Sequence, residues 1–160
     1  MILFGLRVRM RSKLLITVVV MLPIILVSCA TAPSYQAKAI NRSEGSIVRG
    51  WASGRFAYFT RTEVENVDGQ RLSIWSQVGG GPLVDPGLRV LSVAGTYTGL
   101  FGGRDTGRVE LTATLKAGHT YRVKAERSGE IMTLWVEEQE THEVVSEKRS
   151  TNTTHWIQWL

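Results

Sequence analysis

The chain has 160 residues and a formal net charge of +5, with 19 Lys and Arg against 14 Asp and Glu, and it contains a single cysteine, Cys29. Four of the cations lie in residues 1–28, which hold no acid, so the rest of the chain carries 15 basic against 14 acidic side chains. This near-neutral balance excludes the strongly basic surface that favours nucleic-acid partners. One cysteine excludes an intramolecular disulfide, and the length suits a single domain with one core.

Residues 1–28 have the parts of an export signal. A basic stretch comes first, with Arg7, Arg9, Arg11 and Lys13. The apolar run that follows, Leu14–Val27, is interrupted by Pro23 and is shorter than the roughly 20 residues that a membrane-spanning helix needs. We therefore interpret residues 1–28 as a signal peptide that is removed during export. A helix that stays in the membrane as a permanent anchor is the alternative.

The end of this segment, Leu26-Val27-Ser28-Cys29, resembles the bacterial lipobox, in which an aliphatic and a small residue precede an invariant cysteine. The resemblance implies that the Cys29 thiol takes a diacylglyceryl group, and that cleavage then frees the Cys29 amine for acylation, for example with palmitate. The alternatives are a cysteine that happens to end a signal and a buried structural thiol. Lipidation accounts best for an unpaired cysteine in an exported protein.

Residues 30–46 are small and polar and show no helical apolar pattern. We expect residues 29–46 to comprise the lipidated cysteine and a flexible linker, followed by a folded domain over residues 47–160. Ala30 directly follows the cysteine, and by resemblance to known lipoproteins an alanine there favours the outer membrane. The expected location is therefore the outer membrane, with the domain facing the periplasm.

From residue 47 onward the apolar pattern has a period of two, and turn signals recur at short intervals. Asp68-Gly69 and Asp85-Pro86-Gly87 are the clearest turns, and Gly95 marks a candidate bulge within a strand. Residues 72–78 are expected to return against the preceding strand as a hairpin. The expected strands cover residues 55–67, 72–78, 88–98, 108–116, 121–126, 131–136, 144–148 and 154–160.

These short strands, with one apolar and one polar face, predict an all-β fold. About seven strands in sequence are typical of a single antiparallel β-sandwich of immunoglobulin-like or transthyretin-like architecture. A closed barrel is the competing architecture.

Three motifs in a fixed order, together with Trp135, resemble a family of small, uncharacterised proteobacterial lipoproteins. The motifs are Val67-Asp68-Gly69, then Asp85-Pro86-Gly87-Leu88-Arg89-Val90, then Leu115-Lys116-Ala117-Gly118-His119-Thr120-Tyr121-Arg122-Val123. The resemblance covers residues 55–146 and implies an immunoglobulin-like or transthyretin-like sandwich. It departs at residues 138–143, where the family often has a different turn, and at Leu88-Arg89, where it usually has a histidine. The family has no established catalytic residues, so the resemblance assigns none here.

Catalytic, metal and cofactor sites are not predicted. The three histidines, His119, His142 and His155, are not spaced as metal ligands. The glycine-rich stretches 79–81 and 102–103 lack the Lys-Ser/Thr of a phosphate-binding P-loop. Four carboxylates fit a solvated charge run on an exposed hairpin better than a catalytic pair; they are Glu137, Glu138, Glu140 and Glu143.

Trp51, Trp156 and Trp159 are the candidate contact residues, because exposed aromatic rings stack on sugars and anchor interfaces. We favour the alternative that Trp156 and Trp159 fill the core or pack on Trp51, since large exposed apolar patches are rare. The expected function is a non-enzymatic binding or structural role of a membrane-anchored envelope lipoprotein. A carbohydrate- or peptidoglycan-binding module and an accessory partner of an envelope protein assembly are the alternatives.

Overall fold

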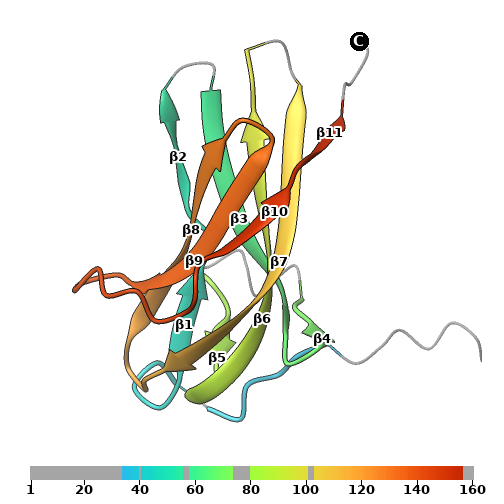
Figure 1. Ribbon diagram of the computed structural model, residues 1–160. Coiled ribbons are helices and arrows are strands. Elements are labelled where there is room, and N and C mark those ends of the chain that lie inside the picture. The colour runs from blue at the N-terminus through green and yellow to red at the C-terminus, as the bar shows by residue number, and fades with distance from the viewer. Residues whose placement is uncertain (1–33, 40, 56–57, 74–79, 101–102, 157–160) are drawn as a thin grey trace, which may run out of the picture. The chain divides into compact units, whose positions relative to one another are not determined.

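The computed structural model describes residues 34–39, 41–55, 58–73, 80–100 and 103–156. All regular structure in these residues is β-strand, arranged in two sheets that face one another (Figure 1). This arrangement confirms the all-β sandwich predicted from the alternating pattern. The expected signal peptide, Cys29 and the first residues of the expected linker lie outside the described residues. None of the described segments is a helix long and apolar enough to cross a membrane.

Eleven strands lie in the described residues, more than the roughly seven expected, because several edge strands have only two to four residues. In chain order they are β1 (Ser46–Arg49), β2 (Ala52–Arg55), β3 (Tyr58–Val67), β4 (Gln70–Arg71), β5 (Leu83–Val84), β6 (Gly87–Thr98), β7 (Arg104–Leu115), β8 (Thr120–Ser128), β9 (Ile131–Glu138), β10 (Arg149–Asn152) and β11 (Thr154–Trp156).

The first sheet has the order β10-β9-β8-β1-β5, and the second has β11-β7-β6-β3-β2 with β4 attached to β3. Neighbouring strands are antiparallel except β1 and β8, which run parallel from Ile47 opposite Thr120. The sandwich is therefore mixed rather than wholly antiparallel as predicted. Both strands start at the same end of the sheet, where the backbone N–H of Ile47 donates to the carbonyl of His119.

The core lies between the two sheets, and the predicted alternation places its side chains. Strands β6 and β7 pair without interruption from Gly87 opposite Leu115 to Thr98 opposite Arg104, and every second residue faces inward. The fully buried side chains include Val48, Leu91, Val93, Leu111, Leu115, Val123, Met132, Leu134 and Val136. The predicted core faces of residues 108–116, 121–126 and 131–136 are thereby confirmed.

Two local predictions about β3 and β6 need correction. The Asp68-Gly69 turn is present, with φ of 49° and 75°, but its return strand β4 ends at Arg71, and residues 74–78 lie outside the described segments. The predicted bulge at Gly95 is wrong, because the bulge falls between Val64 and Asn66 instead. A side-chain carbon on Gly95 would lie 2.4 Å from the Met132 sulfur, so this glycine provides space for the opposite sheet.

The strand directions define two ends of the sandwich (Figure 1). At the hairpin end, β2 meets β3, β6 meets β7, β8 meets β9, and β11 finishes. At the linker end lie residues 34–39 and 41–45, β4, β5 and the connections after β7 and β9. The predicted edge strand 144–148 is reduced to two isolated bridges at Val144 and Ser146, because the strand on this edge begins only at Arg149.

The described part of the expected flexible linker has contacts with the sandwich that the sequence did not predict. The backbone N–H of Tyr35 donates to the carbonyl of Arg71 at 2.8 Å. The Asp85 carboxylate accepts hydrogen bonds from the backbone N–H groups of Lys38 and Ala39, at 2.8 and 2.9 Å. Strand β1 then begins at Ser46. The chain therefore meets the linker end of the sandwich from Tyr35 onward.

Candidate ligand-binding surface

The structure separates the predicted tryptophans. Trp156 lies on β11 and is 65% exposed, while Trp51 lies before β2 at the other edge of the same sheet. Trp159 lies outside the described residues. The interpretation that the C-terminal tryptophans fill the core or pack on Trp51 is therefore wrong for Trp156. The reason is that β11 pairs with the edge of β7, where Trp156 faces Arg104 instead of the core.

Trp51 is half-buried and held by its neighbours. Its backbone N–H donates to the Thr62 hydroxyl at 2.7 Å, and its carbonyl accepts from the Thr62 backbone at 2.7 Å. The Lys124 ammonium lies 3.9 Å from the centre of the indole ring, a cation–π contact. Trp51 therefore has a structural role, and it also lines a cleft beside β1.

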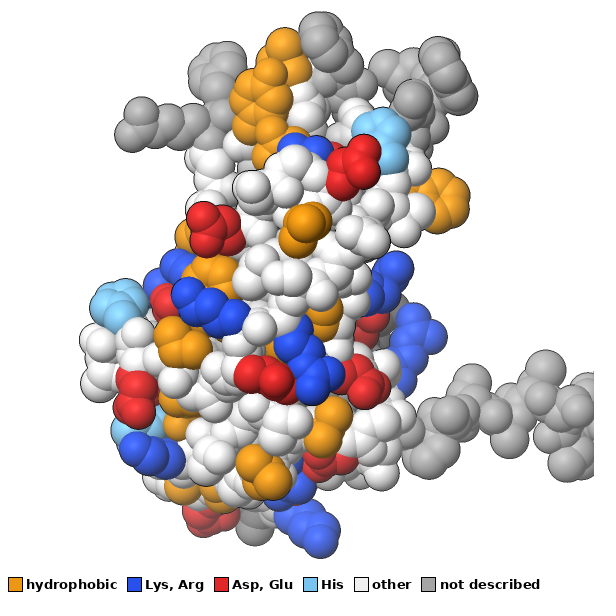
Figure 2. Space-filling view, viewed as in Figure 1, with side chains coloured by type: hydrophobic (Ala, Val, Ile, Leu, Met, Phe, Trp, Pro, Cys, Tyr) orange, Lys and Arg blue, Asp and Glu red, His pale blue; other side chains and the backbone are white. Residues whose placement is uncertain are grey.

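Figure 2 shows apolar side chains near the top of the molecule, separated by polar and charged ones, and others over the lower half of the same face. Five of the eight large apolar side chains that are exposed among the described residues belong to the hairpin end. These residues come from three hairpins and the last strand, which is why no single sequence window shows them. They are Tyr58 (51% exposed), Phe59 (47%), Leu100 (53%), Ile131 (48%) and Trp156 (65%). Large exposed apolar groups that cluster are typical of binding surfaces.

Two of these aromatic residues belong to one row across the outer face of the second sheet. Phe59 is paired with Thr98, Thr98 with Arg104, and Arg104 with Trp156. Because directly paired residues share a face, all four point outward, and three strand spacings separate Phe59 from Trp156 by about 14 Å. The row thus has two exposed rings at its ends with a hydroxyl and a guanidinium between them.

The sequence pointed to Trp156 but missed Phe59. The available signal was parity: Tyr58, Thr60, Thr62 and Val64 share the inward face, which places Phe59 on the outer face. Its partner across the row could not be found without the strand order.

A cluster of charged and aromatic side chains lies at the hairpin end, behind this row. Asp105 is buried, with its Oδ2 atom 2.6 Å from Arg127 Nη2 and its other oxygen hydrogen-bonded to His155 Nδ1. The Arg127 guanidinium lies 4.4 Å from the centre of the Tyr97 ring, which stacks on Tyr58. Because His155 belongs to β11, this cluster holds the strand that carries Trp156. Among the described residues, His155 hydrogen-bonds to Asp105 and to no serine or threonine hydroxyl.

The interpretation of Glu137 and Glu138 as a solvated charge run is wrong, because both are buried. One Glu138 oxygen accepts from the backbone N–H of Glu140 at 2.9 Å and from the Thr141 hydroxyl at 2.7 Å. These bonds close the turn after β9. Glu140 and Glu143 are exposed, as predicted.

The environment of Glu138 favours its charged form. Hydrogen bonds from the backbone and hydroxyl of Thr141 lower the pKa of Glu138; burial opposes this, and the Glu140 N–H and the nearby His119 support it. Glu137, on the other face of β9, lies 3.4 Å from Lys124 Nζ and 3.5 Å from His142 Nδ1. Within the described residues, no three His, Cys, Asp or Glu side chains converge as a metal site.

Asp85 has a comparable role at the start of β6. Burial would raise the pKa of this carboxyl, but hydrogen bonds from Ala39 and Lys38, the Tyr35 hydroxyl and the charge of Arg89 together lower it. Asp68 accepts from the backbone N–H of Val90 at 2.9 Å and pairs with Arg89 at 2.9 Å. The motif residues Asp68 and Asp85 therefore both fix turns at the linker end.

Comparisons with known proteins found no matching family model, no matching curated protein and no matching solved structure. The resemblance to small proteobacterial lipoproteins thus stays a prediction that rests on the order of its motifs.

Proposed function

We propose that this chain is a lipid-anchored, non-enzymatic binding protein of the bacterial envelope. In this proposal, a lipid on Cys29 holds the chain at the outer membrane, and the sandwich faces the periplasm. The observation that carries a binding role is the cluster of exposed apolar side chains at the hairpin end. Residues 34–39 contact the opposite, linker end of the sandwich and not the hairpin end.

The outward row favours a glycan as the ligand. Phe59 and Trp156 offer flat apolar faces that can stack on sugar rings, and Thr98 and Arg104 between them can hydrogen-bond to hydroxyl, amide or carboxylate groups. A separation of about 14 Å between the rings suits an extended chain of several sugars rather than a single ring. Peptidoglycan strands have this chemistry.

A protein partner is the second candidate, and the edge strand β11 favours it. This strand has three residues, lies at the edge of the second sheet, and carries Trp156, the most exposed aromatic side chain among the described residues. Exposed strand edges accept an added strand from a partner, and exposed tryptophans are common anchors of protein interfaces.

Binding to insoluble peptidoglycan sacculi tests the glycan proposal. The full chain, purified in a non-ionic detergent, should co-sediment with sacculi, and Phe59→Ala or Trp156→Ala should weaken binding roughly tenfold or more. Leu88→Ala is the matched control, because Leu88 is 69% exposed but lies at the linker end. Equal binding by all three variants, or no binding by the wild type to sacculi or soluble glycan fragments, rules out this surface as a glycan site.

The protein-partner alternative makes a different prediction in intact cells. A photo-crosslinker placed at Trp156 should then capture a discrete envelope protein, and one at Leu88 should not.

The anchor has its own test. Cys29→Ala should abolish palmitate labelling and leave the unprocessed precursor. Normal labelling and processing of this variant would refute the anchor without affecting the binding surface.

A further inference from the structure

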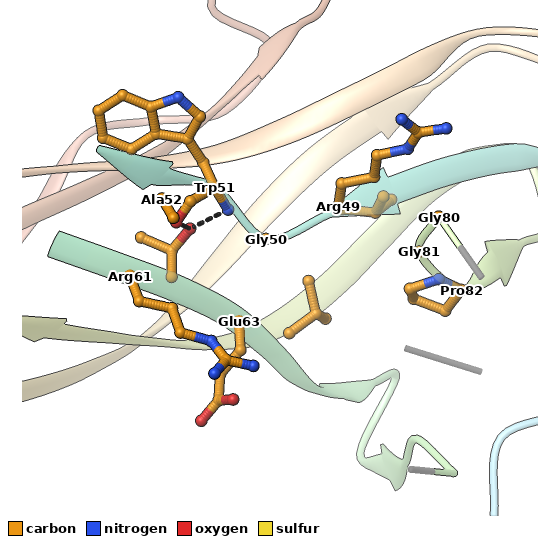
Figure 3. A pocket seen from close by; sticks show the side chains of 12 residues that line it. Arg49, Gly50, Trp51, Ala52, Arg61, Glu63, Gly80, Gly81 and Pro82 are labelled. Atoms are coloured by element: carbon orange, nitrogen blue, oxygen red, sulfur yellow. Dashed lines mark hydrogen bonds between the residues drawn. The ribbon is translucent and has the colours of Figure 1, made fainter. Parts of the chain in front are cut away.

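A second recess lies away from the aromatic row, where the chain leaves β1 and enters β2. This cleft has a volume of about 260 Å³ and is bounded by β1, the start of β2, β3 and residues 80–82 (Figure 3). Figure 3 shows Arg49 on the side of Gly80 and Gly81, and Arg61 together with Glu63 on β3. Within the cleft, Arg49 is thus the cationic side chain beside Gly80 and Gly81, while Arg61 lies apart from it on β3.

Two guanidinium groups meet in front of Gly80. A side-chain carbon built on Gly80 would lie 3.3 Å from Arg49 Nη2 and 3.7 Å from Arg42 Nη2. Arg49 comes from β1, and Arg42 comes from the turn that precedes it. Two like charges this close repel one another, so their convergence is favourable when an anion lies between them.

The described residues do not neutralise this pair of charges. Neither Arg42 nor Arg49 has a carboxylate within ion-pair distance in the described part of the chain, where the other arginine pairs involve Arg89, Arg108, Arg127 and Arg149. The acid that lines the cleft, Glu63, accompanies Arg61 on β3. The Arg49 Nε atom is moreover buried without a hydrogen-bond partner among the described residues. A buried unpaired donor is unfavourable and marks a place for an acceptor.

The loop keeps the space open. Gly80 and Gly81 have φ of 109° and 103°, a backbone region that other residues rarely adopt. A side-chain carbon on Gly81 would lie 2.7 Å from Arg49 Cγ and 2.9 Å from the Val48 carbonyl. Glycine at these positions therefore lets the loop approach β1 while leaving room in front of the guanidinium groups.

We propose that a phosphate group binds between Arg42 and Arg49, beside Gly80 at the edge of this cleft. A guanidinium donates two parallel N–H bonds to a phosphate, and two guanidinium groups balance its negative charge. The group can belong to a lipid headgroup or to a soluble phosphate, since both present anionic non-bridging oxygens. This inference does not depend on the glycan surface, which lies at the hairpin end.

Calorimetric titration of the full chain in non-ionic detergent tests the proposal, with inorganic phosphate as one probe. Vesicles of phosphatidylglycerol in phosphatidylcholine, against phosphatidylcholine alone, are the other probe. Wild type should bind at least one of them, and Arg49→Gln should weaken binding roughly tenfold or more. Arg42→Gln, in an exposed turn, should weaken it as well and covers the case that Arg49→Gln fails to fold. Arg71→Gln, an exposed arginine outside the cleft, should bind like wild type.

Each result has a defined meaning. Binding of inorganic phosphate that is lost in both Arg42→Gln and Arg49→Gln supports a site for phosphate groups in general. Binding of anionic vesicles alone, lost in the same variants, supports a site for a lipid headgroup. No binding by the folded wild type, or equal weakening by Arg71→Gln, overturns the proposal.

Discussion

The two ends of this sandwich differ in the contacts of their carboxylates and in the exposure of their aromatic side chains. At the linker end, the carboxylates of Asp68, Asp85 and Glu138 accept hydrogen bonds from backbone N–H groups of nearby strands and turns. At the hairpin end, the buried carboxylate of Asp105 meets Arg127 and His155 instead, and apolar side chains are exposed at the same end. One end uses its polar groups to fix loops, and the other uses them to support exposed aromatic side chains.

This difference bears on function because exposed apolar groups contribute little to stability. The carboxylates that accept backbone hydrogen bonds stabilise the fold, whereas the rings of Phe59 and Trp156 remain exposed to solvent. A large ring kept in water at one end of the domain therefore needs a reason other than folding, which is why the binding role is placed there.

The largest effect is expected at the linker end, for Glu138→Ala. The variant leaves the turn after β9 without its acceptor, since the backbone N–H groups of Glu140 and Thr141 and the Thr141 hydroxyl all bind Glu138. The loss in free energy of unfolding should be about 2–3 kcal/mol, measured by urea denaturation of the full chain in detergent.

Glu140→Ala provides the matched control, because Glu140 is exposed in the same turn and the change should fall within about 0.5 kcal/mol. An equal loss in both variants would mean that the Glu138 carboxylate does not stabilise the turn.

A smaller effect is expected from pH at the same end. The pKa values of Glu138 and Asp85 are lowered in the fold, so their charged forms stabilise it above the ordinary carboxyl pKa of about 4. This contribution is lost as the pH falls through the lowered values. Urea denaturation should therefore show Glu138→Gln destabilised near neutral pH, by about 1–2 kcal/mol, and this difference should shrink under acid conditions.

For Glu140→Gln, the same measurement should show no such trend with pH. A Glu138→Gln deficit that stays constant into strong acid would exclude a charged Glu138 as the cause.

The smallest effect on stability is expected at the hairpin end. Trp156→Ala and Phe59→Ala remove exposed rings, so each should change the free energy of unfolding by no more than about 0.5 kcal/mol in urea. These variants combine an intact fold with the loss of binding proposed above. A large destabilisation by either one would give its ring a structural role and remove the contrast between the two ends.

Local patterns predicted much of the linker end. Asp68-Gly69 forms its tight turn because both residues tolerate a positive φ, and the alternation in β7, β8 and β9 places the same side chains inward as in the structure. The family-like motifs around Asp68 and Asp85 coincide with side chains that hydrogen-bond to nearby turns. The sequence located these turns because turn-forming residues are a local signal. The partners of the two carboxylates, such as Arg89 for Asp68 and Ala39 for Asp85, are 21 and 46 residues away and were not predicted.

The hairpin end was not predictable in the same way. Phe59 and Trp156 are separated by almost a hundred residues and share a row only because β3, β6, β7 and β11 are neighbours in that order. The burial of Glu138 likewise depends on how the turn after β9 folds back over the carboxylate, which a run of acidic residues does not reveal.

The sequence by itself determined that the chain has an all-β domain, where its main turns fall and which strand faces are apolar, because a period of two and turn-forming residues are local properties. Only the tertiary structure decided which strands are neighbours. The packing of the strands brings Gly80 up to Arg42 and Arg49, pairs Asp105 with Arg127 and leaves Trp156 outside the core. Such contacts join residues that are distant along the chain, so they exist only once the two sheets have packed.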